Sequence, residues 1–136
     1  MKVIKDLKMW FPVPDDEDGA QVEIKHLNSG DIQDISDETF KIKPQIDAKS
    51  KSAKDIQINA EYNQKLEREM TILRAITGLK NFFDKDGKEI ARTDENVLML
   101  SRVELENGFK FLEFITNCRG KLAEQAAKQK EVEEKN

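Results

Sequence analysis

The sequence predicts an α+β fold, with a short antiparallel β-hairpin at the N-terminus packed on a mainly α-helical C-terminal part of three to four helices. Two observations lead to this prediction. Residues 21–27 alternate apolar and polar side chains, which is the period of a half-buried strand. Tyr62, Leu66, Met70 and Leu73 recur at intervals of three and four residues, which is the spacing of one apolar stripe on a helix.

Length and composition favour one domain over residues 1–123, followed by a frayed or disordered tail at 124–136. The chain has 136 residues, 38% hydrophobic and 37% charged, and a domain of this size buries roughly two thirds of its unfolded surface. A net charge of −4 argues against a dominant nucleic-acid role, which needs a basic face. The apolar runs are too short to cross a bilayer. We therefore expect a cytoplasmic protein without a membrane partner.

The N-terminal segment 1–27 contains both expected strands. The first, over residues 8–13, also alternates, but Pro12 and Pro14 lack the backbone N–H that a central strand donates. This strand is therefore expected at a sheet edge. The acidic loop 15–19 would connect it to the second strand in an antiparallel hairpin.

A short helix is expected over residues 28–40. Asn28 or Ser29 would cap its N-terminus, and Ile32 and Ile35 would lie on one face. The segment 41–58 follows; it is rich in lysine and poor in bulky residues, so we expect a mobile polar segment there.

The remaining residues, 59–123, are predicted to be helical. The first helix would cover 59–80, the second 94–103, and the last would run from about Glu106 to beyond Leu122. The tail beyond them has helix propensity but almost no apolar face, so it should make few contacts with the domain.

The first two of these helices are separated by an exposed turn at Asp84–Gly87, in which the glycine can adopt a positive φ. Thr93 is the expected N-cap of the second helix. Five of the seven phenylalanines surround this region, and we expect most of them, Phe83 and Phe111 in particular, to be core. The five are Phe82, Phe83, Phe109, Phe111 and Phe114.

Nothing in the sequence indicates a catalytic, cofactor or metal site. If Gly87 is the glycine of a calcium-binding EF-hand loop, Phe82 and Thr93 occupy the first and last ligand positions, and neither fits. The other acidic loop fails in the same way. Cys118 falls on an apolar helix side and is expected to be a buried thiol, and the single histidine, His26, has no partners at metal-ligand spacing. We expect a protein that is not an enzyme.

Several short motifs of apolar, aromatic and turn residues are spread over most of the chain. They are Trp10, Pro12, Pro14, 22–27, 76–79, Phe82, Phe83, 84–87, 93–96 and 111–115. These motifs resemble those of the tail assembly chaperones of long-tailed bacteriophages and prophages, although Leu79 stands where that family often has a tryptophan.

The resemblance implies a non-catalytic protein that binds the aggregation-prone tape measure protein and helps to recruit tail tube subunits. Such chaperones are absent from the mature virion. An apolar groove near the C-terminal end would hold the client, and its candidate residues are Leu112, Ile115, Leu122 and the adaptable Met70. Self-association is left open.

One alternative function comes from a different class. The helices over 94–118 could form a helix-turn-helix of a small nucleic-acid-binding regulator. That function predicts a basic second helix, whereas Glu104, Glu106 and Glu113 lie in or before it.

Overall fold

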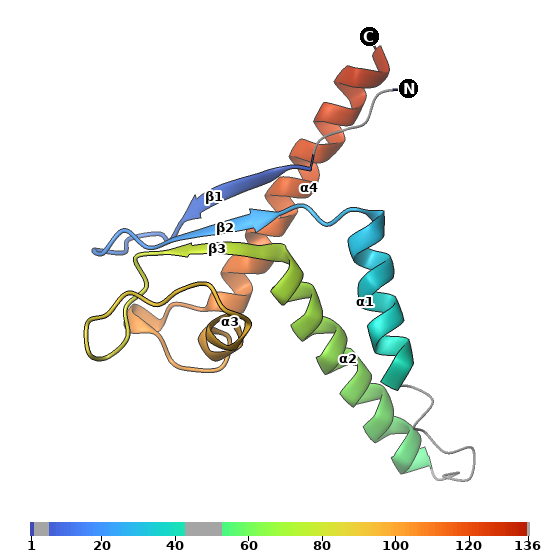
Figure 1. Cartoon of the computed structure of the whole chain (residues 1–136), viewed down its shortest axis with the longest axis horizontal. Coiled ribbons are helices and arrows are strands. Elements are labelled where there is room, and N and C mark those ends of the chain that lie inside the picture. The colour runs from blue at the N-terminus through green and yellow to red at the C-terminus, as the bar shows by residue number, and fades with distance from the viewer. Residues whose placement is uncertain (2–5, 43–52, 136) are drawn as a thin grey trace. The chain divides into compact units, whose positions relative to one another are not determined.

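The computed structural model of the chain describes residues 1, 6–42 and 53–135, with side chains at 1, 6–39 and 64–131. These residues form a three-stranded antiparallel sheet and four α-helices, in the order β1, β2, α1, α2, β3, α3, α4 (Figure 1). The predicted α+β class is therefore confirmed. The chain divides into two compact units, one made of 1–26 and 75–136 and the other of 27–74.

The sheet of the first unit has the strand order β1-β2-β3. Strand β1 (Lys8–Pro12) pairs with β2 (Gln21–Lys25), which confirms the predicted hairpin and the edge position of the proline-containing strand. The third strand, β3 (Ile76–Lys80), pairs with the other side of β2 and has a bulge opposite Glu23 and Ile24. The helix predicted over residues 59–80 is therefore wrong for these five residues.

Helix α4 (Phe111–Lys135) lies against β1 and β2 and completes the core of the first unit (Figure 1). Its most buried side chains recur at intervals of four, three and four residues, so they form one stripe along the helix. Val22 and Ile24 alternate along β2 onto one face and are fully buried. The buried stripe of α4 consists of Phe111, Ile115, Cys118 and Leu122.

Between β3 and α4 the chain forms a small hairpin and the short helix α3 (Asp94–Leu100). The Ile90 N–H donates to the Phe82 carbonyl at 2.8 Å, and Gly87 has φ 79°, as expected for the turn. Thr93 caps α3 as predicted, because its hydroxyl accepts a hydrogen bond from the Asn96 N–H at 3.0 Å. The predicted helix 94–103 is three residues too long.

The second unit contains helices α1 (Ser29–Ile42) and the part of α2 (Ala53–Ala75) up to Arg74. Asn28 caps α1: its side-chain oxygen accepts from the Asp31 N–H at 2.9 Å, and Asp31 accepts from the Asn28 N–H at 3.1 Å. Arg74 on α2 forms ion pairs with Asp31 at 3.4 Å and Asp34 at 3.2 Å on α1. Of the two isoleucines expected on one face of this helix, Ile35 is buried and Ile32 is 58% exposed.

Three predicted boundaries need correction. Within the expected mobile segment 41–58, residues 41–42 end α1 and residues 53–58 begin α2, whereas residues 43–52 lie outside the described part. Within the expected helices 59–123, α2 ends at Ala75 and is followed directly by β3. The tail 124–136, expected to be frayed, is helical through Lys135.

Candidate functional site

A cavity of about 600 Å³ opens on the first unit where three loops meet. The first loop joins β1 to β2, the second follows β3, and the third connects α3 to α4. None of these loops has the periodic pattern of a helix or strand. Their geometry depends instead on left-handed residues and on side-chain hydrogen bonds to the backbone.

The β1–β2 loop is held by Asp16. Its carboxylate accepts a hydrogen bond from the Ala20 N–H at 2.8 Å, and the Val13 N–H donates to the Ala20 carbonyl at 2.8 Å. Asp15 and Gly19 have φ values of 57° and 69°, in the left-handed region that turns use. The acidic loop is therefore a folded turn, and Asp16 has a structural role in it.

The second loop is fastened to the first by Asn81. This residue has φ 60°, and its side-chain amide donates to the Gly19 carbonyl at 3.1 Å. A few residues on, the Asp84 carboxylate accepts from the N–H groups of Asp86 at 2.9 Å and Lys88 at 3.0 Å, which closes the small hairpin. These bonds place Phe82 and Phe83 at the cavity.

The third loop turns sharply at Asn107 and Gly108, whose φ values are 59° and 68°. The Phe109 N–H donates to the Glu106 carbonyl at 3.1 Å within this turn. Asparagine and glycine are the residues that adopt left-handed φ most readily. The turn brings Glu106 and the Phe109 ring to the same cavity.

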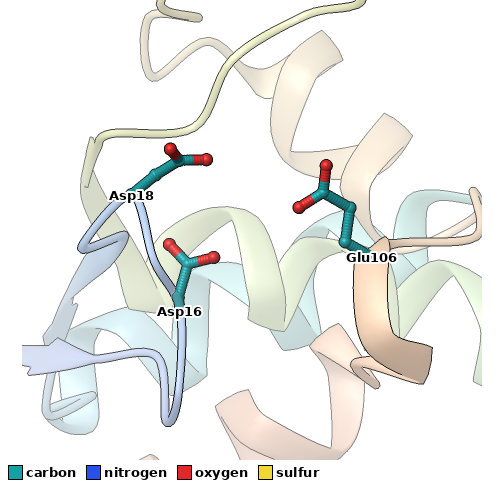
Figure 2. Close-up of side chains that lie close together, drawn as sticks. All are labelled: Asp16, Asp18 and Glu106. Carbon is teal, nitrogen blue, oxygen red and sulfur yellow. The ribbon is translucent and has the colours of Figure 1, made fainter.

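Three carboxylates converge across the cavity. The side chains of Asp16 and Asp18 approach from the β1–β2 loop and that of Glu106 from the opposite loop, and they point toward one another (Figure 2). One oxygen from each lies within 4.8 Å of the other two. Such a group of oxygens can attract a cation, either a divalent metal ion or the ammonium or guanidinium group of a basic side chain.

The same cavity has an apolar part formed by phenylalanine rings. Phe82 is half-buried and packs edge-on against Phe111, with ring centroids 6.3 Å apart and planes at 87°. Phe83 is 46% exposed, which contradicts its predicted place in the core, whereas Phe111 is 3% exposed as predicted. Leu105 and Phe109 also line the cavity and are half-buried.

A second hollow, of about 570 Å³, adjoins the first and shares Glu104, Leu105 and Phe109 with it. Val103, which lines this hollow, is 48% exposed, and Met99 on α3 is 38% exposed. The segment between β3 and α4 therefore presents several large apolar side chains to solvent.

The structure does not bring the sequence-predicted binding residues together on an open groove. Ile115 and Leu122 are 2% and 1% exposed because they belong to the core beneath the sheet. Leu112 is half-buried and lines the second hollow. Met70 is half-buried on α2, in the other unit. Of the four, only Leu112 lines one of these hollows.

The cavity was not predicted from the sequence, although the acidic loop and the phenylalanines that form it were both recognised there. The acidic loop 15–19 and the phenylalanines were assigned separately, to a solvated turn and to the core. No spacing rule relates Asp18 to Glu106, since they become neighbours only through the tertiary fold.

Cys118 and His26 lie outside the cavity lining. Cys118 is 2% exposed, as predicted for a buried thiol. Burial raises the pKa of the Cys118 thiol above its ordinary value, and the positive charge of Lys121 partly offsets this rise. A thiol held in its protonated form is a poor nucleophile. His26 is half-buried just after β2, and its backbone N–H donates to the Leu7 carbonyl at 2.8 Å.

Comparison with models of known protein families, with curated proteins and with solved structures found no match. Among the described helices, none combines the length and the apolar character that crossing a bilayer requires.

Proposed function

We propose that the chain is a non-catalytic tail assembly chaperone of a long-tailed bacteriophage or prophage. It binds the tape measure protein in the cytoplasm of the host, keeps it soluble while tail tube subunits are recruited, and is absent from the mature virion. The observation that carries the proposal is the apolar side chains exposed between β3 and α4. Phe83 and Val103 are each nearly half exposed, and Phe83 belongs to one of the family-like motifs.

The physical case starts from the client. Long amphipathic helices without partners aggregate through their exposed apolar stripes. A protein that holds them reversibly needs an apolar surface that is accessible before binding and bordered by polar groups. The adjoining hollows, which share Leu105 and Phe109, meet this requirement.

The nucleic-acid-binding alternative is not favoured. It would place the residues between α3 and α4 next to phosphates, and that connection carries Glu104 and Glu106 at an acidic cavity. Carboxylates repel the phosphate backbone, which supplies most of the affinity of DNA-binding proteins.

Co-expression tests the proposal. The tape measure protein encoded beside this chain is produced alone, with the chain, and with a Phe83→Ala/Val103→Ala variant, and its soluble fraction and its elution with the chain from a sizing column are measured. We expect the parent chain to raise solubility and to form a complex, and the variant to do so less well because it loses exposed apolar contact area.

An Ile32→Ala variant is the matched control, since Ile32 is also exposed but belongs to α1. Its effect on the client should be small. Equal solubility of the tape measure protein with and without the chain, and no complex on the column, would exclude the chaperone function.

A further inference from the structure

The charged side chains that line the cavity are all negative. Six carboxylates line the cavity, and none of the described lysine, arginine or histidine side chains does. The chain as a whole has 23 basic residues against 27 acidic ones, so this bias is a local property. The six are Asp15, Asp16, Asp18, Asp84, Glu104 and Glu106.

Only two of these carboxylates serve the fold through hydrogen bonds that the structure shows. Asp16 and Asp84 each accept backbone N–H groups of their own loops. Within the described part of the chain, the side chains of Asp18 and Glu106 make no hydrogen bond or ion pair, yet each has an oxygen close to the other and to Asp16. Like charges this close repel one another; Asp18 and Glu106 are exposed, so water screens part of this repulsion, and a bound positive group would relieve the rest.

The cavity is larger than an ion alone needs, and part of its wall is apolar. Its volume is about 600 Å³, and Val13, Phe82, Phe83, Leu105 and Phe109 are part of its wall. An occupant that complements both the acidic and the apolar parts of the lining must carry positive charge next to apolar side chains. The negative charge of the lining disfavours nucleic acid as the occupant.

We propose that this cavity binds a basic amphipathic segment of a protein partner. Lysine or arginine side chains of the segment meet Asp18 and Glu106, and its apolar side chains contact the rings of Phe83 and Phe109. The inference deepens the proposed function, because it names the chemistry of the client segment that the chaperone holds.

The binding test uses three synthetic peptides and isothermal titration calorimetry with the full chain. One peptide places leucine and lysine at amphipathic helical spacing, the second replaces every lysine with glutamate, and the third replaces every leucine with serine. We expect saturable binding of the leucine–lysine peptide only. Equal affinity for the leucine–glutamate peptide, or for the serine–lysine peptide, would overturn the proposal.

A pair of charge variants then locates the site. The Asp18→Asn/Glu106→Gln variant should weaken binding of the leucine–lysine peptide about three- to tenfold, the range expected when two partly solvated ion pairs are lost. A Glu124→Gln/Glu131→Gln variant changes the net charge equally at exposed positions of α4 outside the cavity lining. It should bind like the parent, and equal weakening in both variants would show attraction by net charge alone.

The parent and the Asp18→Asn/Glu106→Gln variant also test whether the cavity holds a different occupant. Saturable calcium binding that is abolished in Asp18→Asn/Glu106→Gln and that displaces the peptide would make the cavity a metal site. Dimerisation of the parent that is lost in this variant would assign the cavity to a second copy of the chain. Either result overturns the proposal. Thermal melting should show the variant folded and at least as stable as the parent, because a repulsion is relieved.

Co-expression with the tape measure protein separates this inference from the proposed function. If the parent solubilises the client and Asp18→Asn/Glu106→Gln does so equally well, the function stands and the basic-segment inference fails. If the peptide binds the cavity but the client is not solubilised, the inference stands and the chaperone function fails.

Discussion

Gly78 allows a tryptophan ring to pack on one face of the sheet. It lies in the middle of β3, and a Cβ added there would come within 2.8 Å of Cη2 and 3.1 Å of Cζ2 of Trp10. The Trp10 ring covers this position, and the Lys80 ammonium group lies 4.3 Å from its centroid. A side chain at position 78 would therefore collide with the ring that packs on the strand backbone.

We expect Gly78→Ala to destabilise the protein by about 1–3 kcal/mol, because Trp10 must leave its packed position. Gly120→Ala is the matched control. Gly120 lies in α4 and its Cβ would meet no atom within 4 Å, so this change should stabilise by about 0.5–1 kcal/mol. Urea unfolding followed by the fluorescence of the single tryptophan measures both. A Gly78→Ala protein as stable as the parent would show that the ring shifts freely.

Phe83 and Phe111, which were both predicted to lie in the core, should differ in how much their replacement by alanine lowers stability. Phe111→Ala should cost about 3–5 kcal/mol, since it removes a ring that is 3% exposed and packs against Phe82. Phe83→Ala should change stability by less than about 1 kcal/mol, since its ring is 46% exposed. Chemical denaturation of the two variants compares them directly. A large loss in Phe83→Ala would mean that this ring is part of the core.

Cys118 gives a prediction about pH. The folded state holds the thiol proton more tightly than the unfolded chain, because burial raises the pKa above the ordinary value of 9.0. This contribution to stability is complete below the unfolded pKa and is lost as the pH rises through the raised folded pKa. The free energy of unfolding should thus fall more steeply in the parent than in Cys118→Ala as the pH rises above about 9. Identical slopes would show that the thiol does not contribute.

At the scale of elements, the strands and helices that follow one local pattern were predictable. The alternation of β2 and the Thr93 cap of α3 are local signals, and the structure has both. Strand β3 was not predictable, because Leu73 and Ile76 continue the spacing of the preceding helix stripe. Pairing with β2 overrides that local pattern, and the sequence does not show which segment β2 will pair with.

The sequence could predict the separate parts of the candidate site but not that they lie next to one another. The acidic turn and the exposed segment between β3 and α4 could be recognised, but their meeting depends on three loops with left-handed residues. The amide of Asn81 that fastens two of these loops has no sequence signature. The groove expected around Ile115 and Leu122 failed for a related reason, since the sheet covers the α4 stripe that looked unpartnered in sequence.

The end of α4 should be dispensable for stability even though it is helical. Of the side chains described between Glu124 and Glu131, only Ala126 is half-buried and the others are exposed. A chain that ends at Ala123 should lose helical circular dichroism in proportion to the residues removed and keep its melting temperature. A large fall in melting temperature would show that this end packs on the protein or on a second copy.

At the scale of the whole molecule, the second unit is an insertion in a β-hairpin. Strand β2 ends at Lys25 and β3 begins at Ile76, and Ile24 pairs directly with Ile76 in the antiparallel ladder. The connection between these neighbouring strands runs from His26 to Ala75 and contains the whole of the second unit, residues 27–74. A connection of this kind can be replaced by a tight turn if each unit has its own core.

We therefore expect the first unit to fold without the second. In the test protein, Asn-Gly replaces residues 27–74 and joins His26 to Ala75, which suits a short antiparallel hairpin. The side chains that bury the sheet against α4, such as Val22 and Leu122, all remain. The shortened chain should melt cooperatively, and a Val22→Asp version should not, because it puts a charge at a fully buried position.

Because the cavity lining belongs to the first unit, the shortened chain should also bind the leucine–lysine peptide with the affinity of the parent. Cooperative melting without peptide binding would show that the second unit contributes to the binding surface, and loss of melting would show that the sheet depends on the helices inserted between its strands.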